Sequence, residues 1–153
     1  MKITNIKKMQ AEKGFTIVEL LIVIVVIAIL ATITIVSYNG VQNRAKSTAA
    51  QKSASTVRDK AEAYNALNST YPVGAATSAA MTTTFNSTTE SALTGTGVTL
   101  AATPTAANGQ TTVRYAGCSN GAGYTITYWD YTAGTLSGTL TGGATCTLVT
   151  VTS

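Results

Sequence analysis

A long apolar segment containing a single carboxylate constrains this chain more than any other feature of the sequence. The segment runs from Phe15 to Val36, and its one charged residue is Glu19. As a helix rising 1.5 Å per residue, it would extend about 33 Å, which is enough to cross a bilayer. A charge at the bilayer centre costs about 2.5–3.5 kcal/mol on insertion scales, so Glu19 is expected to have a function.

Residues 1–36 have three competing interpretations. An ordinary secretory signal has an apolar stretch of about 7–15 residues and a small-residue cleavage site after it. Here the stretch is longer, and no clear Ala-x-Ala site follows it. A plain membrane anchor fits the length but gives no reason for Gly14 or Glu19. The third interpretation comes from the order of the residues around Gly14.

Residues 13–19 read Lys-Gly-Phe-Thr-Ile-Val-Glu and lead directly into the apolar tail. This segment resembles the N-terminus of type IV prepilins and the related pseudopilins. The resemblance implies that residues 1–14 are a leader peptide, which a prepilin peptidase removes by cleaving after Gly14. It further implies that Phe15 becomes an N-methylated N-terminus and that Glu19 directs assembly by neutralising this amine on a neighbouring subunit. A pair within one subunit is the alternative, since Phe15 and Glu19 would lie about one helical turn apart.

The lysines of the leader predict the orientation in the membrane. Most of the net charge of +4 belongs to this part of the chain, which holds Lys2, Lys7, Lys8 and Lys13 against Glu12. Basic residues before a span favour a cytoplasmic leader, with everything after Val36 outside. We therefore expect a single-pass membrane protein before assembly and a cell-surface pilus afterwards.

From Ser37 the pattern becomes amphipathic, which predicts that the helix continues to Asn68. Apolar residues recur mostly at spacings of three and four, as is typical of one helical face: Tyr38, Val41, Ala45, Ala49, Val57, Ala61, Tyr64 and Leu67. Pro72 ends this helix, because a proline disfavours helical geometry in the residue before it. With no earlier proline, any bend or unwinding in a filament is expected near residues 32–41, where β-branched residues and Gly40 lower helix propensity. Arg58 and Glu62 are spaced to pair across one turn.

Residues 69–153 predict a globular head built on a small sheet. Residues 73–110 suggest a loop-rich connector with room for one short helix or strand. Plausible strands follow at Thr111–Ala116, Tyr124–Tyr131, Thr135–Leu140 and Thr145–Val151. We expect the aromatic residues Tyr124, Tyr128, Trp129 and Tyr131 to serve the core rather than a binding site.

Together these segments give the fold class α+β, with a long N-terminal helix packed against a small antiparallel sheet. This is the lollipop shape that the resemblance to type IV pilins implies. The expected domains are a leader (1–14), a transmembrane or filament-core helix (15–36), an amphipathic helix packed on the head (37–68) and the head itself (69–153).

Two cysteines, Cys118 and Cys146, lie in the C-terminal third. Outside the membrane an oxidising compartment favours a disulfide between them, worth about 3–4 kcal/mol in the chain-entropy model. Two buried free thiols are the alternative. A metal site is not expected, because the chain has no histidine and no close cysteine pair.

The residue content argues against an enzyme and against nucleic-acid binding. Histidine is absent, and the only acids after residue 62 are Glu90 and Asp130, so no acid–base or cofactor chemistry is expected. Beyond Lys60 the only basic residue is Arg114, which is too little to neutralise phosphates.

We therefore expect a structural subunit of a type IV pilus, a homo-oligomeric helical filament that pilus assembly machinery builds. Its role could be motility, adhesion, secretion or DNA uptake. The alternatives are a minor pilin or pseudopilin of a type II secretion or DNA-uptake system, and a membrane-tethered surface protein that does not assemble.

Overall fold

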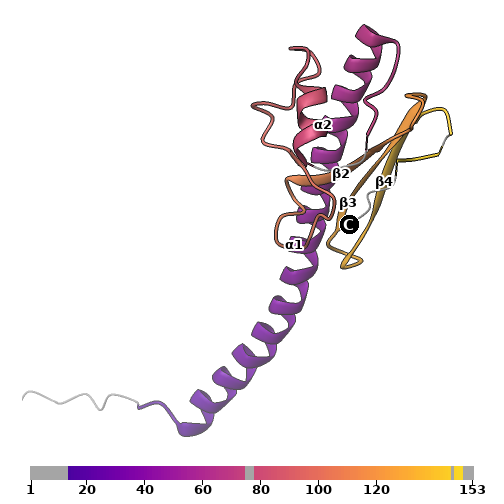
Figure 1. The fold of residues 1–153 in the computed structure, drawn as a ribbon. Helices are drawn as coiled ribbons and strands as arrows, with labels where there is room; N and C mark the ends of the chain where they lie inside the picture. The colour runs from indigo at the N-terminus through magenta and orange to yellow at the C-terminus, as the bar shows by residue number, and fades with distance from the viewer. Residues whose placement is uncertain (1–13, 75–77, 146, 150–153) are drawn as a thin grey trace, which may run out of the picture. The chain divides into compact units, whose positions relative to one another are not determined.

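The computed structural model describes residues 14–74, 78–145 and 147–149. Its elements, in chain order, are α1 (Ile17–Asn68), α2 (Ser78–Phe85), β1 (Thr99–Leu100), β2 (Thr112–Gly117), β3 (Gly123–Asp130) and β4 (Thr135–Gly143) (Figure 1). The chain divides into two compact units, Met1–Asn39 and Gly40–Ser153, and the division falls within α1. A long N-terminal helix followed by a small sheet confirms the α+β class.

The helix α1 is continuous through the zone of low helix propensity. It begins at Ile17 and ends at Asn68, close to the predicted limits of 15 and 68. Among the β-branched residues, the hydroxyl groups of Thr32 and Thr34 donate to the carbonyls of Ala28 and Ala31, both at 2.9 Å. These bonds satisfy the threonine side chains within the helix itself. The bend or unwinding expected in a filament stays a prediction.

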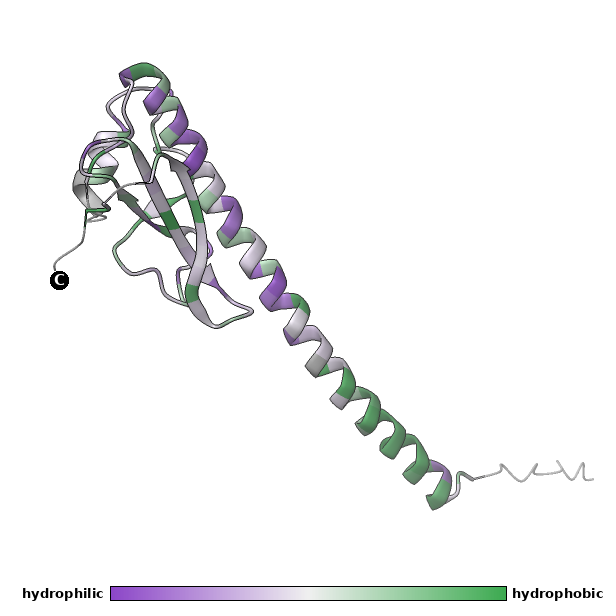
Figure 2. Cartoon of the chain, turned by 90° about the vertical axis from the view of Figure 1, so that its right-hand side faces the viewer, coloured by the Kyte–Doolittle hydropathy of each residue, from purple (hydrophilic) through white to green (hydrophobic). Residues whose placement is uncertain are grey.

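Within the second unit, a narrow stripe of α1 faces the protein interior. Ala50, Ala54, Val57 and Ala61 are fully buried at spacings of four, three and four. Three of the four are alanines, so the helix axis can approach the sheet closely. The predicted face was too wide, however, since Val41 and Leu67 are 65% and 55% exposed. Figure 2 shows how the apolar N-terminal part of α1 gives way to mixed polar residues further along.

The sheet has the order β1-β2-β3-β4, and it is mixed rather than antiparallel. β2 pairs antiparallel with β3, and β3 pairs antiparallel with β4. β1 instead pairs parallel with β2, with Thr99 opposite Thr112 and Leu100 opposite Val113. The prediction of an antiparallel sheet is therefore corrected at this edge, because the connection through residues 101–111 leads into a strand that runs in the same direction as β1.

The predicted strand at 145–151 is also corrected over the residues that the structure describes there. Leu148 forms an isolated antiparallel bridge with Cys118, and no named strand includes it. Two backbone bonds support the bridge, from Ser119 N to Thr147 O (3.3 Å) and from Val149 N to Gly117 O (3.1 Å). The described residues of this segment thus pair with the chain at and just after the end of β2. Cys146, Thr150 and Val151 lie outside the described residues.

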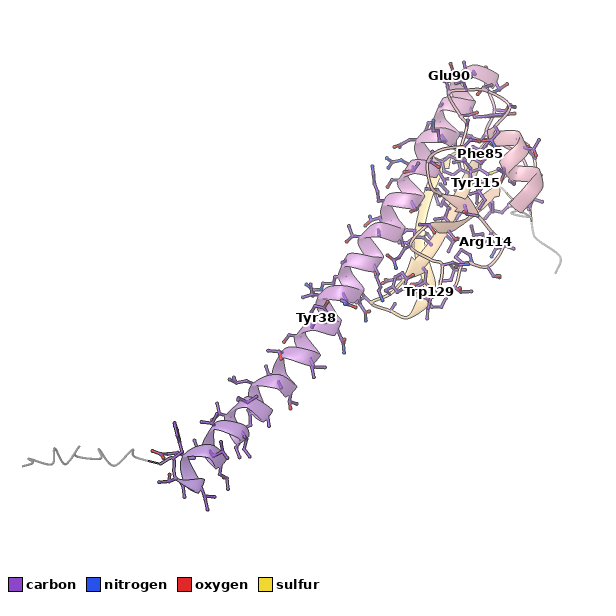
Figure 3. The ribbon with its side chains drawn as sticks, turned by 90° about the vertical axis from the view of Figure 1, so that its left-hand side faces the viewer. Tyr38, Phe85, Glu90, Arg114, Tyr115 and Trp129 are labelled. Carbon is purple, nitrogen blue, oxygen red and sulfur yellow. The ribbon has the colours of Figure 1, made fainter. Side chains whose placement is uncertain are left out.

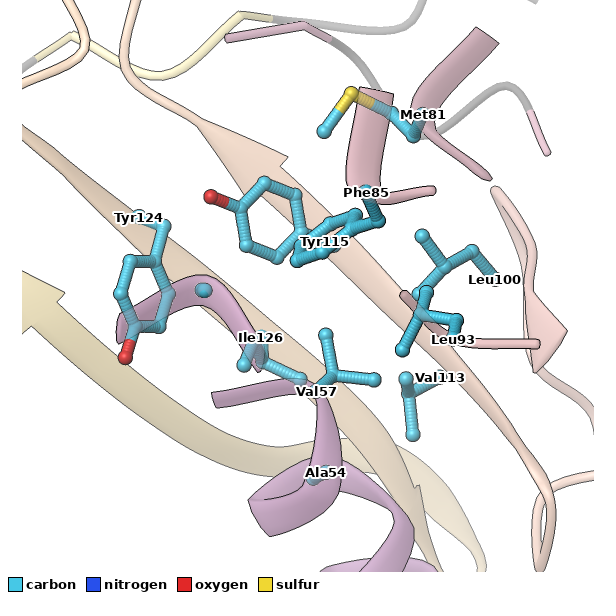
Figure 4. Packing of buried hydrophobic residues seen from close by; sticks show 11 residues of the cluster. Ala54, Val57, Met81, Phe85, Leu93, Leu100, Val113, Tyr115, Tyr124 and Ile126 are labelled. Atoms are coloured by element: carbon cyan, nitrogen blue, oxygen red, sulfur yellow. The ribbon is translucent and has the colours of Figure 1, made fainter. Parts of the chain in front are cut away.

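The core of the second unit is formed where α1, α2 and the sheet meet, and it is partly aromatic (Figure 4). Its buried residues are Ala54, Val57, Ala61, Met81, Phe85, Leu93, Leu100, Val113, Tyr115, Tyr124 and Ile126. The ring of Tyr115 stacks on Tyr124 with centroids 5.5 Å apart and meets Phe85 edge-on at 5.0 Å. Of the four aromatic residues predicted for the core, Tyr124 lies in it and Tyr128 packs against it, whereas Trp129 and Tyr131 are half-buried.

Candidate processing and assembly site

The segment around the predicted cleavage site lies just outside the helix. Gly14, Phe15 and Thr16 precede the first helical residue, Ile17. Gly14 is exposed, and a Cβ added to it would meet no atom within 4 Å. The Phe15 side chain is 91% exposed. A peptide bond between Gly14 and Phe15 is therefore accessible to an enzyme.

Thr16 and Glu19 close a reciprocal set of hydrogen bonds at the start of α1. The Glu19 carboxylate oxygen Oε2 accepts from the Thr16 backbone N–H and from the Thr16 hydroxyl, both at 2.8 Å. The Thr16 Oγ1 in turn accepts the Glu19 backbone N–H at 3.2 Å. This arrangement is a capping box, in which the residue before the helix and the third helical residue satisfy each other's amides. Glu19 also places negative charge at the positive end of the helix dipole.

The sequence motif predicts a role for Glu19 but none for Thr16. The signal was present, because a Thr-x-x-Glu pattern directly before an apolar run is the sequence signature of a capping box. The predicted pair between Glu19 and the Phe15 amine is distinct from the capping box. In the uncleaved chain the Phe15 nitrogen belongs to a peptide bond, so this pair can form only after cleavage.

Beyond the cap, the helix presents apolar side chains on all sides. The large apolar residues from Ile17 to Ile35 are exposed by 47% (Val25) to 85% (Ile17). Tyr38 follows them at 63% exposed and projects from the helix (Figure 3). α1 is long and apolar enough to cross a membrane. A helix that is apolar all round requires lipid or other protein to cover it.

Polar contacts fix the second half of α1 against the sheet, close to the turn after β3. The Ser47 hydroxyl donates to Asp130 Oδ1 at 3.1 Å and accepts the Tyr131 backbone N–H at 2.9 Å. Asp130 also accepts the backbone N–H groups of Thr132 and Ala133, and these two bonds hold the pKa of its carboxyl below the ordinary value.

A second group of contacts joins the end of α1 to the opposite end of the sheet. Glu62 accepts hydrogen bonds from the Tyr124 hydroxyl at 2.9 Å and the Tyr71 hydroxyl at 3.0 Å. Burial raises the pKa of Tyr124, and its bond to the Glu62 carboxylate raises it further. The predicted Arg58–Glu62 pair is corrected here. Arg58 contacts its neighbour Asp59 at 2.9 Å, and the tyrosines bind Glu62.

Cys118 is fully buried directly after β2. Its predicted partner, Cys146, lies outside the described residues. The residues on either side of that position, Thr147 and Thr145, are described, and Thr147 bonds to Ser119 beside Cys118. On the Thr147 side, the backbone next to position 146 thus lies beside Cys118.

The segment from the leader into the helix also matches a known family. Residues 9–35 match the family described as prokaryotic N-terminal methylation motif. Searches of curated proteins and of solved structures gave no match. The matched residues include the Gly14–Phe15 bond, the capping box and most of the exposed apolar helix. The chain therefore carries the class III signal peptide of type IV pilin-like proteins, which implies processing by a prepilin peptidase and handling by membrane assembly machinery.

Proposed function

We propose that this chain is a structural subunit of a type IV pilus. The observation that carries the proposal is the combination of an accessible Gly14–Phe15 bond with an exposed apolar helix that holds one carboxylate. An ordinary membrane anchor accounts for the helix alone. A pilus subunit accounts for the bond, the carboxylate and the helix together.

In this proposal the membrane holds the subunit until assembly. Residues 1–14 form a cytoplasmic leader, residues 15–36 cross the membrane, and residues 37–153 lie outside as the amphipathic helix and head. The peptidase cleaves after Gly14 on the cytoplasmic side, and the new amine of Phe15 is then methylated. Because the cut precedes the apolar helix, the subunit keeps its anchor after losing the leader.

Assembly then replaces lipid with other copies of the same helix. The exposed apolar surface of residues 17–35 must be buried away from water, and either a bilayer or the packed helices of a filament core can bury it. Inside that core an unpaired ammonium or carboxylate would be heavily penalised, whereas a pair is tolerated. Glu19 therefore pairs with the Phe15 amine of a neighbouring subunit and fixes the axial position of each copy.

The head serves as the outer part of the filament and is proposed to have no catalytic role. A disulfide between Cys118 and Cys146 closes its C-terminal end. No cofactor, metal or nucleic acid is part of the proposal.

Replacing Glu19 by alanine tests the assembly role. We expect Glu19→Ala to abolish filaments while the subunit still accumulates in the membrane, because the Phe15 amine loses its counter-charge. Electron microscopy of sheared filaments and membrane fractionation measure the two results. Glu90→Ala is the matched control, since Glu90 is an exposed carboxylate of the head, and it should assemble normally.

Mass spectrometry of the N-terminus provides the second part of the test. The mature subunit should begin at a methylated Phe15. Filaments built from Glu19→Ala subunits, or a mature chain that starts at another residue, would contradict the proposal. Normal surface display of the wild type without any filament would favour the unassembled surface protein instead.

A further inference from the structure

The capping box occupies two backbone amides that a longer helix would need. In an α-helix each N–H donates to the carbonyl four residues earlier. If α1 began before Gly14, the N–H of Thr16 would bond to the carbonyl of Glu12, and that of Glu19 to the carbonyl of Phe15. In the structure Glu19 Oε2 accepts the first N–H and Thr16 Oγ1 accepts the second. The closed box and a helix that runs through Gly14 exclude each other.

The first helical backbone hydrogen bond also shows that α1 does not extend back to Gly14. Leu20 N donates to Thr16 O at 3.3 Å, so helical bonding starts at Thr16. The peptide bond between Gly14 and Phe15 lies before that point, where the chain is not helical. In a longer helix the Gly14 carbonyl would accept the N–H of Val18 and would be unavailable to a peptidase.

The sequence before Gly14 favours a helix, so a feature that stops α1 from extending into it is needed. Residues 8–13 read Lys-Met-Gln-Ala-Glu-Lys, and all six are among the strongest helix formers. The apolar helix follows only three residues later. Between the two segments, Gly14 and the cap at Thr16 are the features that oppose a continuous helix.

We infer that Thr16 is a positioning residue for leader removal. Its cap makes α1 begin at Ile17, two residues after the bond to be cut, and so keeps the helix from extending back through that bond. The inference rests on the proposed function, because it assigns a role in the proposed cleavage after Gly14. The capping hydroxyl holds the Gly14–Phe15 peptide in a non-helical conformation that a peptidase can bind as an extended segment.

The chemical step itself is a hydrolysis. Water adds to the Gly14 carbonyl carbon, and the C–N bond to Phe15 breaks. Gly14 leaves as a carboxylate, and the Phe15 nitrogen takes up protons to become an ammonium group. The peptidase supplies the catalytic groups, and Thr16 contributes only the conformation of the bond.

Cleavage kinetics of capping variants test the inference. The full chain in detergent micelles is incubated with purified prepilin peptidase, and loss of the leader is followed by intact mass. Thr16→Val keeps the side-chain shape but removes both hydrogen bonds of the hydroxyl, so we expect cleavage to slow by up to about fivefold, as the loss of a typical cap implies. Thr16→Ser keeps the hydroxyl and should be cleaved at the wild-type rate.

A second substitution separates conformation from direct contact with the peptidase. Ala11→Gly lowers the helix propensity of the sequence before Gly14 and leaves both residues of the capping box unchanged. It should restore fast cleavage to Thr16→Val and leave the wild-type rate unchanged. Wild-type cleavage of Thr16→Val would overturn the inference. Slow cleavage that Ala11→Gly does not restore would also overturn it, because Thr16 would then act by contacting the enzyme.

Nuclear magnetic resonance distinguishes a failure of this inference from a failure of the proposed function. In micelles without peptidase, the backbone shifts of Gly14 and Phe15 should become more helical in Thr16→Val, and unchanged shifts would overturn the role of the cap. Failure of the peptidase to cleave the unsubstituted chain would instead overturn the proposed processing and this inference with it.

Discussion

Individual polar residues in the second unit hold α1 to the sheet with few charges. Glu62 is the clearest case, because its two carboxylate oxygens accept one tyrosine hydroxyl each, from Tyr71 and Tyr124. The two rings also contact each other edge-on at 5.0 Å. One carboxylate that accepts a hydrogen bond from each hydroxyl fixes both rings against the end of α1.

Removing the Tyr124 hydroxyl tests this arrangement. Tyr124→Phe keeps the buried ring but deletes the 2.9 Å bond to Glu62. We expect the free energy of unfolding to fall by about 1.5–3 kcal/mol, the usual range for a hydrogen bond to a charged group. Chemical denaturation of the full chain in detergent, followed by circular dichroism, measures the change.

Tyr128→Phe is the matched control for this prediction. Tyr128 lies in the same strand and is half-buried, and its hydroxyl makes no hydrogen bond within the part of the chain that the structure describes. The control should change stability by no more than about 0.5 kcal/mol. An equal effect of the two substitutions would show that Glu62 contributes nothing specific.

At the scale of elements, close contact between α1 and the sheet depends on small side chains. Ala54, Val57 and Ala61 are fully buried in the core cluster that also includes residues of β2 and β3. Larger residues at these positions would push the helix away from the sheet. The short helix α2 then covers the remaining side of the core with Met81 and Phe85, which are four residues apart on one face.

A larger residue at one of these positions should therefore destabilise the second unit. We expect Ala54→Leu to lower the free energy of unfolding by about 1–3 kcal/mol, the typical cost of overpacking a filled core. Ala66→Leu is the control, since Ala66 lies on the same helix but is exposed. Denaturant titrations compare the two variants, and a neutral Ala54→Leu would mean that the interface has unfilled space.

At the scale of the whole chain, sequence and structure agree best where one pattern extends over many residues. The limits of α1 could be predicted because a long apolar run is followed by an amphipathic pattern and then Pro72. All four ends of β2 and β3 were predicted to within one residue, since β-branched and aromatic residues there are bounded by glycines. The match to the methylation motif at residues 9–35 could likewise be predicted from the local order of Gly14, Phe15 and Glu19.

The features that the sequence did not reveal depend on long-range partners. β1 has only two residues, Thr99 and Leu100, and it is a strand because β2 lies beside it. Residues 145–151 have strand propensity, but over the described residues there only Leu148 finds a bridging partner. Helical spacing predicted that Arg58 pairs with Glu62. In the fold, hydroxyl groups from distant parts of the chain, such as that of Tyr124, bind Glu62 instead, and Arg58 contacts Asp59.

The proposed disulfide is the prediction that concerns the head as a whole. Linking Cys118 to Cys146 would join the end of β2 to the C-terminal segment across the reversal made by β3 and β4. We expect reduction to lower the free energy of unfolding by about 2–5 kcal/mol, as is usual for a native disulfide of a small secreted domain. Denaturation with and without reductant measures this loss.

The double variant Cys118→Ala/Cys146→Ala provides the control for that experiment. It should have the stability of the reduced wild type and should not respond to reductant. Equal stability of the oxidised and reduced wild type would instead favour two free thiols.

The capping box at the start of α1 has a consequence for the energetics of polymerisation. Glu19 already accepts two hydrogen bonds from Thr16 before any neighbour arrives. Both bonds end on Oε2, so in the proposed filament an incoming amine pairs with a carboxylate that is already partly satisfied, and the net gain is smaller than for a bare carboxylate. Growth then draws its driving force mainly from the apolar helix surfaces, while Glu19 selects the position at which each new subunit stops.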